Sequence, residues 1–273
     1  MSPLTTPRRP VFRSIRLVGA ALMLAAAGVL SACNLNISNQ AEGRSEWKKE
    51  YTLAAGGRLE IKNTNGIIDV EPSDGNTVTI TAERIARAGT DAEAKQAAEA
   101  MEIKEDVTGS SIVLDATVSH IGINIGGGSR QVKFHIRAPK GTILRLSNTN
   151  GNIDVRDMTG ELTLETTNGR IFGRSLAGAT RAETTNGTID LDYASLSSSG
   201  ISAATTNGTV FITLPTTAQA RVNARVTNGG IKTENLTLDT SEKTRRRLTA
   251  TLNGGGPEVR IETTNGEVTL RGK

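Results

Sequence analysis

One tripeptide, Thr-Asn-Gly, occurs seven times in this chain of 273 residues, and it constrains the fold more than any other feature. From Asn150 onward the copies are 18, 18, 21, 21 and 37 residues apart, a period typical of solenoid proteins. An eighth Asn-Gly, which begins at Asn253, lacks the preceding Thr and falls inside the longest interval. The seven copies contain Asn65, Asn150, Asn168, Asn186, Asn207, Asn228 and Asn265.

Apolar and polar residues alternate on both sides of every copy. The positions four and six before the Asn, and two and four after the Gly, are mostly Ile, Leu, Val or Ala. A period of two predicts β-strands, so each repeat is expected to be a strand, a turn and a second strand. Around Asn168 the four positions are Leu164, Leu162, Ile171 and Gly173.

The apolar positions stand at the same offsets from the Asn in each copy, and this equal phase favours a parallel β-solenoid. An antiparallel meander of Asn-Gly hairpins is the alternative. In a solenoid, equivalent residues stack about 4.8 Å apart, and Asn and Gly form corners that tolerate positive φ. The position two before each Asn is expected to form an inward polar ladder whose side chains bond along the stack. That position holds Asn63, Asn148, Thr166, Thr184, Thr205, Val226 and Thr263.

The segment between Gly66 and Asn150 is longer and is expected to form irregular coils. Residues 91–101 predict one helix capped by Thr90 or Asp91, and this helix is expected to cover an open edge. The predicted fold class is therefore all-β: a single-chain parallel β-solenoid, β-helix-like, with irregular N-terminal coils and one short capping helix. Alternating stretches in this segment are residues 77–82, 112–118 and 132–136.

The first 32 residues have the order of a secretory signal. Four Arg residues precede an apolar run of 14 residues, Leu17 to Leu30, and small residues follow it. The run is shorter than the roughly 20 residues that a membrane-spanning helix needs. We therefore predict that residues 1–32 are a cleaved signal peptide.

The residues that follow the apolar run, Leu30-Ser31-Ala32-Cys33, resemble the lipobox of bacterial lipoproteins. In that family the Cys thiol receives a diacylglycerol, the preceding peptide is removed, and the new amine is acylated. The resemblance makes Cys33, the only Cys of the chain, the lipid-attachment residue. Several acyl chains anchor a protein stably where one anchors it marginally. The alternative is an ordinary signal peptide followed by an incidental Cys.

Composition excludes several classes of protein. The formal charge of +4 comes from the four leader Arg residues, and without them 28 basic side chains face 28 acidic ones, so we expect no nucleic-acid partner. One Cys excludes a disulfide scaffold, and two His leave little room for a metal site. Polar residues 33–46 are expected to be a lipid-attached flexible tether, and residues 47–273 the solenoid domain.

The lipobox, the β-rich body and the repeated Thr-Thr-Asn-Gly and Asn-Thr-Asn-Gly units resemble the bacterial putative-adhesin family of unknown function. The resemblance covers roughly Trp47 to Lys273 and implies a β-solenoid of the cell envelope. It carries no catalytic residues, and its adhesin label is a weak warrant for function. The 37-residue interval departs from the shorter spacing, so residues 233–256 are expected to be a protruding loop or an extra coil.

Two rows of carboxylates are candidates for glycoside cleavage or cation binding, because stacking places equivalent residues side by side. Glu165, Glu183 and Glu262 share one outward position, and Glu165 and Glu183 are expected to lie about 4.8 Å apart at the backbone. The second row is Asp69, Asp154 and Asp190. A solvated face is the other interpretation, because Ala204 and Arg225 interrupt the first row and no aromatic walls accompany it.

Other features give weaker indications. The Thr before each Asn could form a hydroxyl ladder that binds an ordered surface, although turn chemistry also explains it. Arg245-Arg246-Arg247 is expected to be a solvated loop with possible contact to an anionic lipid or polymer. His135 is expected to face outward from a strand, His120 to lie in a loop, and Gly126-Gly127-Gly128 to be a flexible loop.

Together these features predict a lipid-anchored, non-enzymatic envelope lipoprotein without a cofactor, acting by surface contact, adhesion or scaffolding. Its expected partners are the membrane, through Cys33, and an envelope protein or polysaccharide. Asn34 after the lipid Cys favours the outer membrane facing the periplasm, with the cell surface as the other location. Two alternatives are a carbohydrate-active solenoid that uses the carboxylate rows and an accessory protein in envelope-stress signalling.

Overall fold

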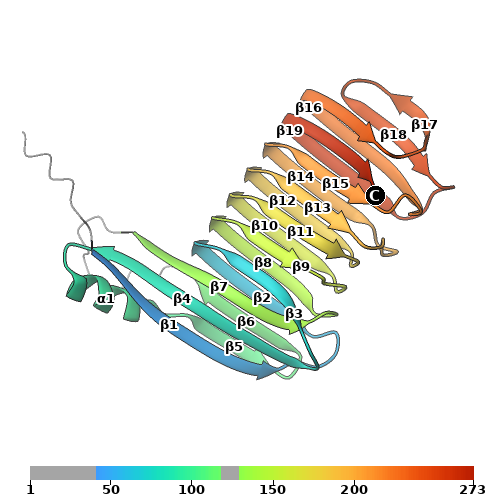
Figure 1. Ribbon diagram of the computed structural model, residues 1–273. Coiled ribbons are helices and arrows are strands. Elements are labelled where there is room, and N and C mark those ends of the chain that lie inside the picture. The colour runs from blue at the N-terminus through green and yellow to red at the C-terminus, as the bar shows by residue number, and fades with distance from the viewer. Residues whose placement is uncertain (1–40, 118–128) are drawn as a thin grey trace, which may run out of the picture. The chain divides into compact units, whose positions relative to one another are not determined.

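The computed structural model describes residues 41–117 and 129–273, and those after Asn39 form one compact unit. The predicted signal peptide, Cys33, His120 and Gly126–Gly128 lie outside the described residues. Within the unit, strands stack side by side into a long solenoid with two sheets, one on each side of a row of corners (Figure 1). The one helix of the described residues is too short to cross a membrane.

Each Thr-Asn-Gly joins a strand of the first sheet to a strand of the second. Neighbouring coils pair in parallel, and Asn168 lies in register with Asn150 on one side and Asn186 on the other. The predicted parallel β-solenoid is therefore confirmed and the meander is wrong. The coils are β2 (Arg58–Asn65) with β3 (Ile68–Ser73), β8 (Ile143–Asn150) with β9 (Ile153–Arg156), β10 (Leu162–Asn168) with β11 (Ile171–Leu176), β12 (Thr180–Asn186) with β13 (Ile189–Tyr193), and β14 (Ile201–Asn207) with β15 (Val210–Leu214), whereas β16 (Ala220–Glu234) and β19 (Glu258–Gly272) each run through their corner.

The last coils do not stack in chain order. Strand β19 lies between β14 and β16, so Asn265 pairs with Asn207 on one side and Asn228 on the other. The 37-residue interval is neither a protruding loop nor an extra coil. It forms two antiparallel strands, β17 (Leu238–Lys243) and β18 (Arg247–Leu252), and β18 extends the first sheet beyond β16. The backbone N–H and C=O groups on the outer side of β16 thereby gain partners.

The N-terminal end is more regular than expected. Strands β6 (Ser111–Ala116) and β7 (Arg130–Pro139) pair in parallel with β2 and β3 and thus make one more coil. Three antiparallel strands extend the two sheets: β5 (Lys104–Thr108) beside β6, and β4 (Thr77–Ala88) followed by β1 (Ala41–Thr52) beside β7.

Strand β1 corrects the predicted boundary between tether and domain. It begins at Ala41 and pairs with β4 along its whole length, so residues 41–46 belong to the sheet. Only Ala41, Trp47 and Tyr51 of its twelve residues are apolar, and its first part is held by ion pairs. Arg44 contacts the carboxylates of Glu42 and Glu83 at 2.7 and 2.5 Å. Polar edge strands of this kind carry no periodic apolar pattern.

The predicted helix, α1 (Asp91–Glu99), packs across β1 and β4 at this end (Figure 1). Thr90 is its cap: the Thr90 hydroxyl accepts from the Glu93 backbone N–H at 3.3 Å, and the Glu93 carboxylate accepts from the Thr90 N–H at 3.1 Å. A side chain at Gly43 would place Cβ only 2.1 Å from the Ala94 carbonyl carbon. Glycine therefore allows the helix to lie directly on the strand.

The core lies between the two sheets and is made by the alternating positions that the repeat predicts. Leu162 and Leu164 from β10, with Ile171 from β11, are fully buried, and equivalent residues of neighbouring coils stack on them. Where the first sheet supplies small residues such as Ala182, the second supplies large ones such as Leu191 and Tyr193. This compensation keeps the interior filled.

The inward polar positions are buried and their side chains bond along the stack, as predicted, with backbone carbonyls of the neighbouring coil as the acceptors. The Thr184 hydroxyl donates to the Gly169 carbonyl at 3.3 Å, and the Asn148 amide donates to the Gly66 carbonyl at 2.8 Å. Each bond links one coil to the corner of its neighbour. A buried hydroxyl or amide is tolerated here because a corner carbonyl lies within reach.

Candidate functional site

The corners form a continuous asparagine ladder along the solenoid. Each Asn side chain donates from Nδ2 to the Oδ1 of the Asn in the next coil, and all six distances are 2.8 or 2.9 Å. None of these Asn residues has positive φ, whereas four corner glycines do, as expected for the corners: Gly66, Gly151, Gly229 and Gly266. The Asn-Gly without a Thr differs, because Asn253 has φ 48°. The ladder follows the order Asn228, Asn265, Asn207, Asn186, Asn168, Asn150 and Asn65.

The corner glycines are required by close backbone approach. A Cβ on Gly187 would lie 1.9 Å from the Gly169 carbonyl oxygen, and a Cβ on Gly208 would lie 1.8 Å from that of Gly187. Only glycine permits this spacing at the corner, whatever its φ. The corner is therefore a rigid edge with a short repeat.

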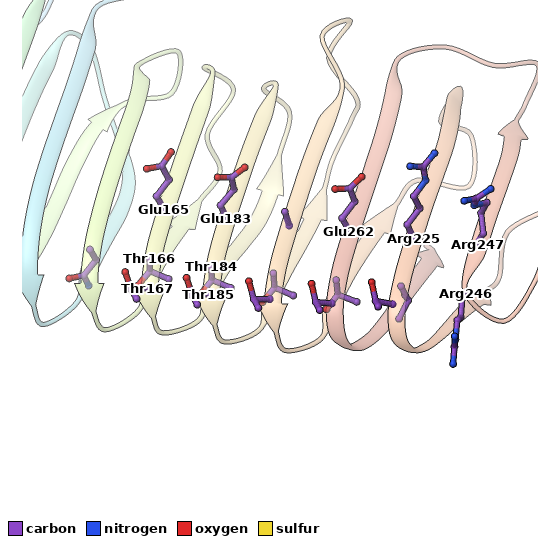
Figure 2. Close-up of a pocket in the computed structure, with 18 of the residues that line it drawn as sticks. Glu165, Thr166, Thr167, Glu183, Thr184, Thr185, Arg225, Arg246, Arg247 and Glu262 are labelled. Carbon is purple, nitrogen blue, oxygen red and sulfur yellow. The ribbon is translucent and has the colours of Figure 1, made fainter.

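Beside this edge, the outer face of the first sheet carries two rows of side chains (Figure 2). The row next to the corner is the predicted threonine ladder; its members are exposed except Thr64, which is half-buried. We call eight consecutive positions of the second row, from Ser147 to Thr244, the charged face; beyond Ser147 the row continues with Lys62 and Asp115. Pairing of the strands places its residues in the order Ser147, Glu165, Glu183, Ala204, Glu262, Arg225, Arg247 and Thr244.

The two rows line an open groove of about 1020 Å³ across eight strands. Carboxylates occupy one half of the charged face, and arginines occupy the other (Figure 2). The hairpin of β17 and β18 closes the basic end, with Arg246 extending past the threonine row. The groove is long, polar and shallow, a shape suited to contact with an extended surface.

The structure brings Glu165 and Glu183 together, as predicted, because they are direct register partners on β10 and β12. Glu183 is engaged by Arg181 of its own strand, at 2.5 Å. Glu262 is likewise held by Arg260 at 2.8 Å. These pairs are exposed, which favours the interpretation of this row as a solvated, ion-paired face.

The structure separates Asp154 from Asp190, because Phe172 occupies the intervening position of the second sheet. Asp154 instead neighbours Asp69. The Phe172 ring is flanked by Arg170 and Arg174, whose guanidinium carbons lie 4.4 and 4.6 Å from its centroid. In register order the predicted carboxylate row is thus Asp69, Asp154, Phe172, Asp190 and Phe211.

Burial raises the pKa of Asp154 above its usual value, and the nearby Asp69 acts in the same direction against Arg170 and Arg156. A raised folded-state pKa means that stability is lost as pH rises through that pKa. We expect Asp154→Asn to be more stable than the parent at neutral pH, by less than about 1 kcal/mol. The difference should vanish near pH 3, where the parent is protonated.

Urea unfolding at both pH values measures this effect, with the exposed Asp74→Asn as the control. A variant that is less stable than the parent at neutral pH would show that the Arg170 ion pair, at 3.6 Å, outweighs burial.

His135 faces outward from β7, as predicted, and its Nδ1 lies 3.7 Å from Asp69 Oδ2. Arg245, Arg246 and Arg247 are exposed at the turn between β17 and β18, where the Thr244 hydroxyl accepts from the backbone N–H of Arg246 and Arg247. Among residues 41–117 and 129–273, no group of three or more His, Cys, Asp or Glu is arranged to hold a metal ion.

The arginine pair at the basic end was not predicted from the sequence. Arg225 and Arg247 are direct cross-strand partners on β16 and β18. They are 22 residues apart, and only the antiparallel return of β18 brings them together. The densest basic run in the sequence pointed to Arg247 but gave no indication of its partner.

Comparison with known proteins gives a family match for the C-terminal half. Residues 158–271, from Met158 to Arg271, match the family model described as Toastrack DUF4097. The matched region covers β10 to β19. No curated protein matches this chain.

Two solved structures are similar to it. One is described as a putative cell adhesion protein from Clostridium sporogenes ATCC 15579, with 14% identity and a TM-score of 0.45 over 84% of this chain and 100% of that one. The other is described as a putative adhesin from Bacteroides fragilis NCTC 9343, with 13% identity and a TM-score of 0.36 over 84% of this chain and 97% of that one.

Proposed function

We propose that this chain is an exported lipoprotein, anchored through Cys33, that acts in the bacterial envelope by surface contact or scaffolding and without catalysis. The observation that carries the anchor is the order of basic residues, apolar run and Leu30-Ser31-Ala32-Cys33, which contains the only Cys of the chain. The proposed location is the outer membrane facing the periplasm, with the cell surface as the alternative.

The proposal of surface contact rests on the two rows beside the corner. They present hydroxyl and charged groups at the spacing of the strands, about 4.8 Å, on a rigid edge. The groove between them is open along its length, so a large partner can reach every row. The proposed partner is an envelope protein or polysaccharide, and the charge balance gives no reason to include nucleic acid.

The anchor is tested with Cys33→Ser in the bacterial host. We expect the parent to partition into the detergent phase and its mature N-terminal peptide to carry the mass of an acylated Cys. The variant should appear in the aqueous phase, because an acyl chain contributes about 0.8 kcal/mol per buried CH₂. Ser38→Ala, which leaves the four lipobox residues intact, is the control. A parent whose mature N-terminal peptide carries no acylated Cys would refute the anchor.

One observation supports a second candidate, a carbohydrate-active face. Glu165 and Glu183 are register partners, so their backbones lie about 4.8 Å apart, near the separation of carboxylates in retaining glycosidases. Incubation with envelope polysaccharides and measurement of released reducing ends tests this candidate. Activity that survives in Glu165→Gln with Glu183→Gln would exclude these two residues.

A further inference from the structure

The arginine pair at the end of the charged face is electrostatically unfavourable in the isolated chain. Arg225 and Arg247 are direct cross-strand partners, and like charges in such positions destabilise a sheet. In the described part of the chain, only Glu242 lies within ion-pair distance of either guanidinium, at 3.6 Å from Arg247. Arg225 has no ion-pair partner among those residues. The two arginines lie between Glu262, the register partner of Arg225 on β19, and Glu242. Because no carboxylate of the described residues is ion-paired with Arg225, its guanidinium is open to negative charge from another molecule.

The order of charges along the charged face shows where that charge can come from. Reading from β10 to β18, the face carries Glu165, Glu183, Ala204, Glu262, Arg225 and Arg247. If a copy of this row is reversed and laid against the original, Glu165 meets Arg247 and Glu183 meets Arg225. Ala204 meets Glu262 at the centre. No two like charges oppose each other.

We propose that the charged face binds a second copy of this chain, face to face, about a twofold axis parallel to the strands. Rotation about that axis reverses the order of the strands and keeps each row opposite its own copy. The contact is then isologous, so every Glu183–Arg225 pair occurs twice. The threonine rows of the two copies also face each other and provide small side chains that allow close approach.

The adjacent row of the same sheet is self-complementary about the same axis. It runs Arg145, Thr163, Arg181, Ser202, Arg260, Asn223, Thr249 and Glu242. Reversal places Arg145 opposite Glu242, Arg181 opposite Asn223, and Arg260 opposite Ser202. Two rows thus satisfy the same symmetry. Their residues come from eight strands between residues 145 and 262, and the order of the residues along each row differs from their order in the chain.

The area of the face fits a modest interface. Eight strands about 4.8 Å apart, each contributing about five residues, present roughly 600 Å² per copy. The total of about 1,200 Å² lies at the lower end of specific interfaces. Because the contact is polar, we expect its affinity to fall as salt rises.

Cysteine pairs in the full-length protein test both the contact and its direction. Thr163 and Thr249 should oppose each other across the axis, so Thr163→Cys with Thr249→Cys should give a crosslinked dimer on mild oxidation in intact membranes. Either substitution alone should not, because each Cys would face a Thr. Crosslinking by the single variants as strong as by the double variant would overturn the proposed geometry, as would no dimer from the double variant.

Charge reversal in that double-Cys background identifies the ion pairs. Glu183→Arg alone or Arg225→Glu alone should reduce the dimer fraction about tenfold, since like charges then meet twice. Combining the two should restore it, because each chain regains both pairs. Circular dichroism verifies that the variants fold. Equal dimer fractions in all three would overturn the proposal, and loss without restoration would indicate another occupant, such as an anionic polymer on the arginines.

These outcomes are independent of the lipid anchor. A Cys33→Ser form of each variant, purified as a water-soluble protein, gives the same comparison in solution. If Cys33 carries no lipid, the location of the chain in the cell differs from the proposed one. The crosslinking pattern of the engineered cysteines stays the same, because it depends only on the contact between the two charged faces.

Discussion

Replacing Gly187 with Ala is expected to lower the free energy of unfolding by about 3 kcal/mol or more, or to prevent folding. The new Cβ would lie 1.9 Å from the Gly169 carbonyl oxygen. The two coils cannot separate to relieve this contact without loss of backbone bonds, because the Gly169 N–H donates to Asn186 O at 3.1 Å and the Ile171 N–H donates to Thr188 O at 2.9 Å.

Urea unfolding followed by circular dichroism measures this loss. Gly141→Ala is the matched control, because a Cβ at Gly141 meets no atom within 4 Å and its backbone has no positive φ. Its effect should stay within about 0.5 kcal/mol. Equal effects at the two positions would show that close approach at the corner does not explain the glycines.

The second largest effect is expected from Asn186→Ala, about 1 to 2 kcal/mol. The Asn186 amide donates to Asn168 Oδ1 at 2.9 Å, and Asn186 Oδ1 accepts from Asn207 at 2.8 Å. Removal of the side chain breaks both bonds and divides the ladder. Partial exposure of the corner lets water replace part of the loss, which keeps the effect below that of Gly187→Ala.

Asn186→Asp separates the two bonds. An Asp carboxylate still accepts from Asn207 but cannot donate to Asn168, so two acceptor oxygens face each other. We expect it to be at least as destabilising as the Ala variant at neutral pH, with Thr185→Ala as the control on the exposed row. An Asp variant as stable as the parent in the same urea series would mean that the ladder contributes little.

The equal hydrophobic phase of the repeats was sufficient to predict parallel stacking. Leu164, Ile171 and their equivalents are apolar at one offset from every Thr-Asn-Gly, and a slip of one residue would expose them all. The phase could not predict the stacking order of the last coils. Asn207, Asn228 and Asn265 have closely similar flanks, so either of the last two could follow Asn207 with the same hydrophobic match.

The candidate site was partly predictable for the same reason. Register alone placed Glu165 beside Glu183, because both lie three residues before an Asn of consecutive coils. It failed for Asp154 and Asp190, where the intervening coil has Phe172 at the equivalent position. Arg225 beside Arg247 depends on an antiparallel return, and the repeat contains no information about that pairing.

The central claim is that the coils form a parallel solenoid in which β19 stacks between the coil of β14 and β15 and strand β16. Its most direct test is the pattern of methyl nuclear Overhauser effects among three buried or partly buried side chains. Val210 is the register partner of Val268, which is in turn the partner of Ile231. We predict strong contacts from Val268 to both Val210 and Ile231, and none between Val210 and Ile231, which lie two strands and about 9.6 Å apart. A direct contact between Val210 and Ile231 would mean that the coils stack in chain order and would contradict this account.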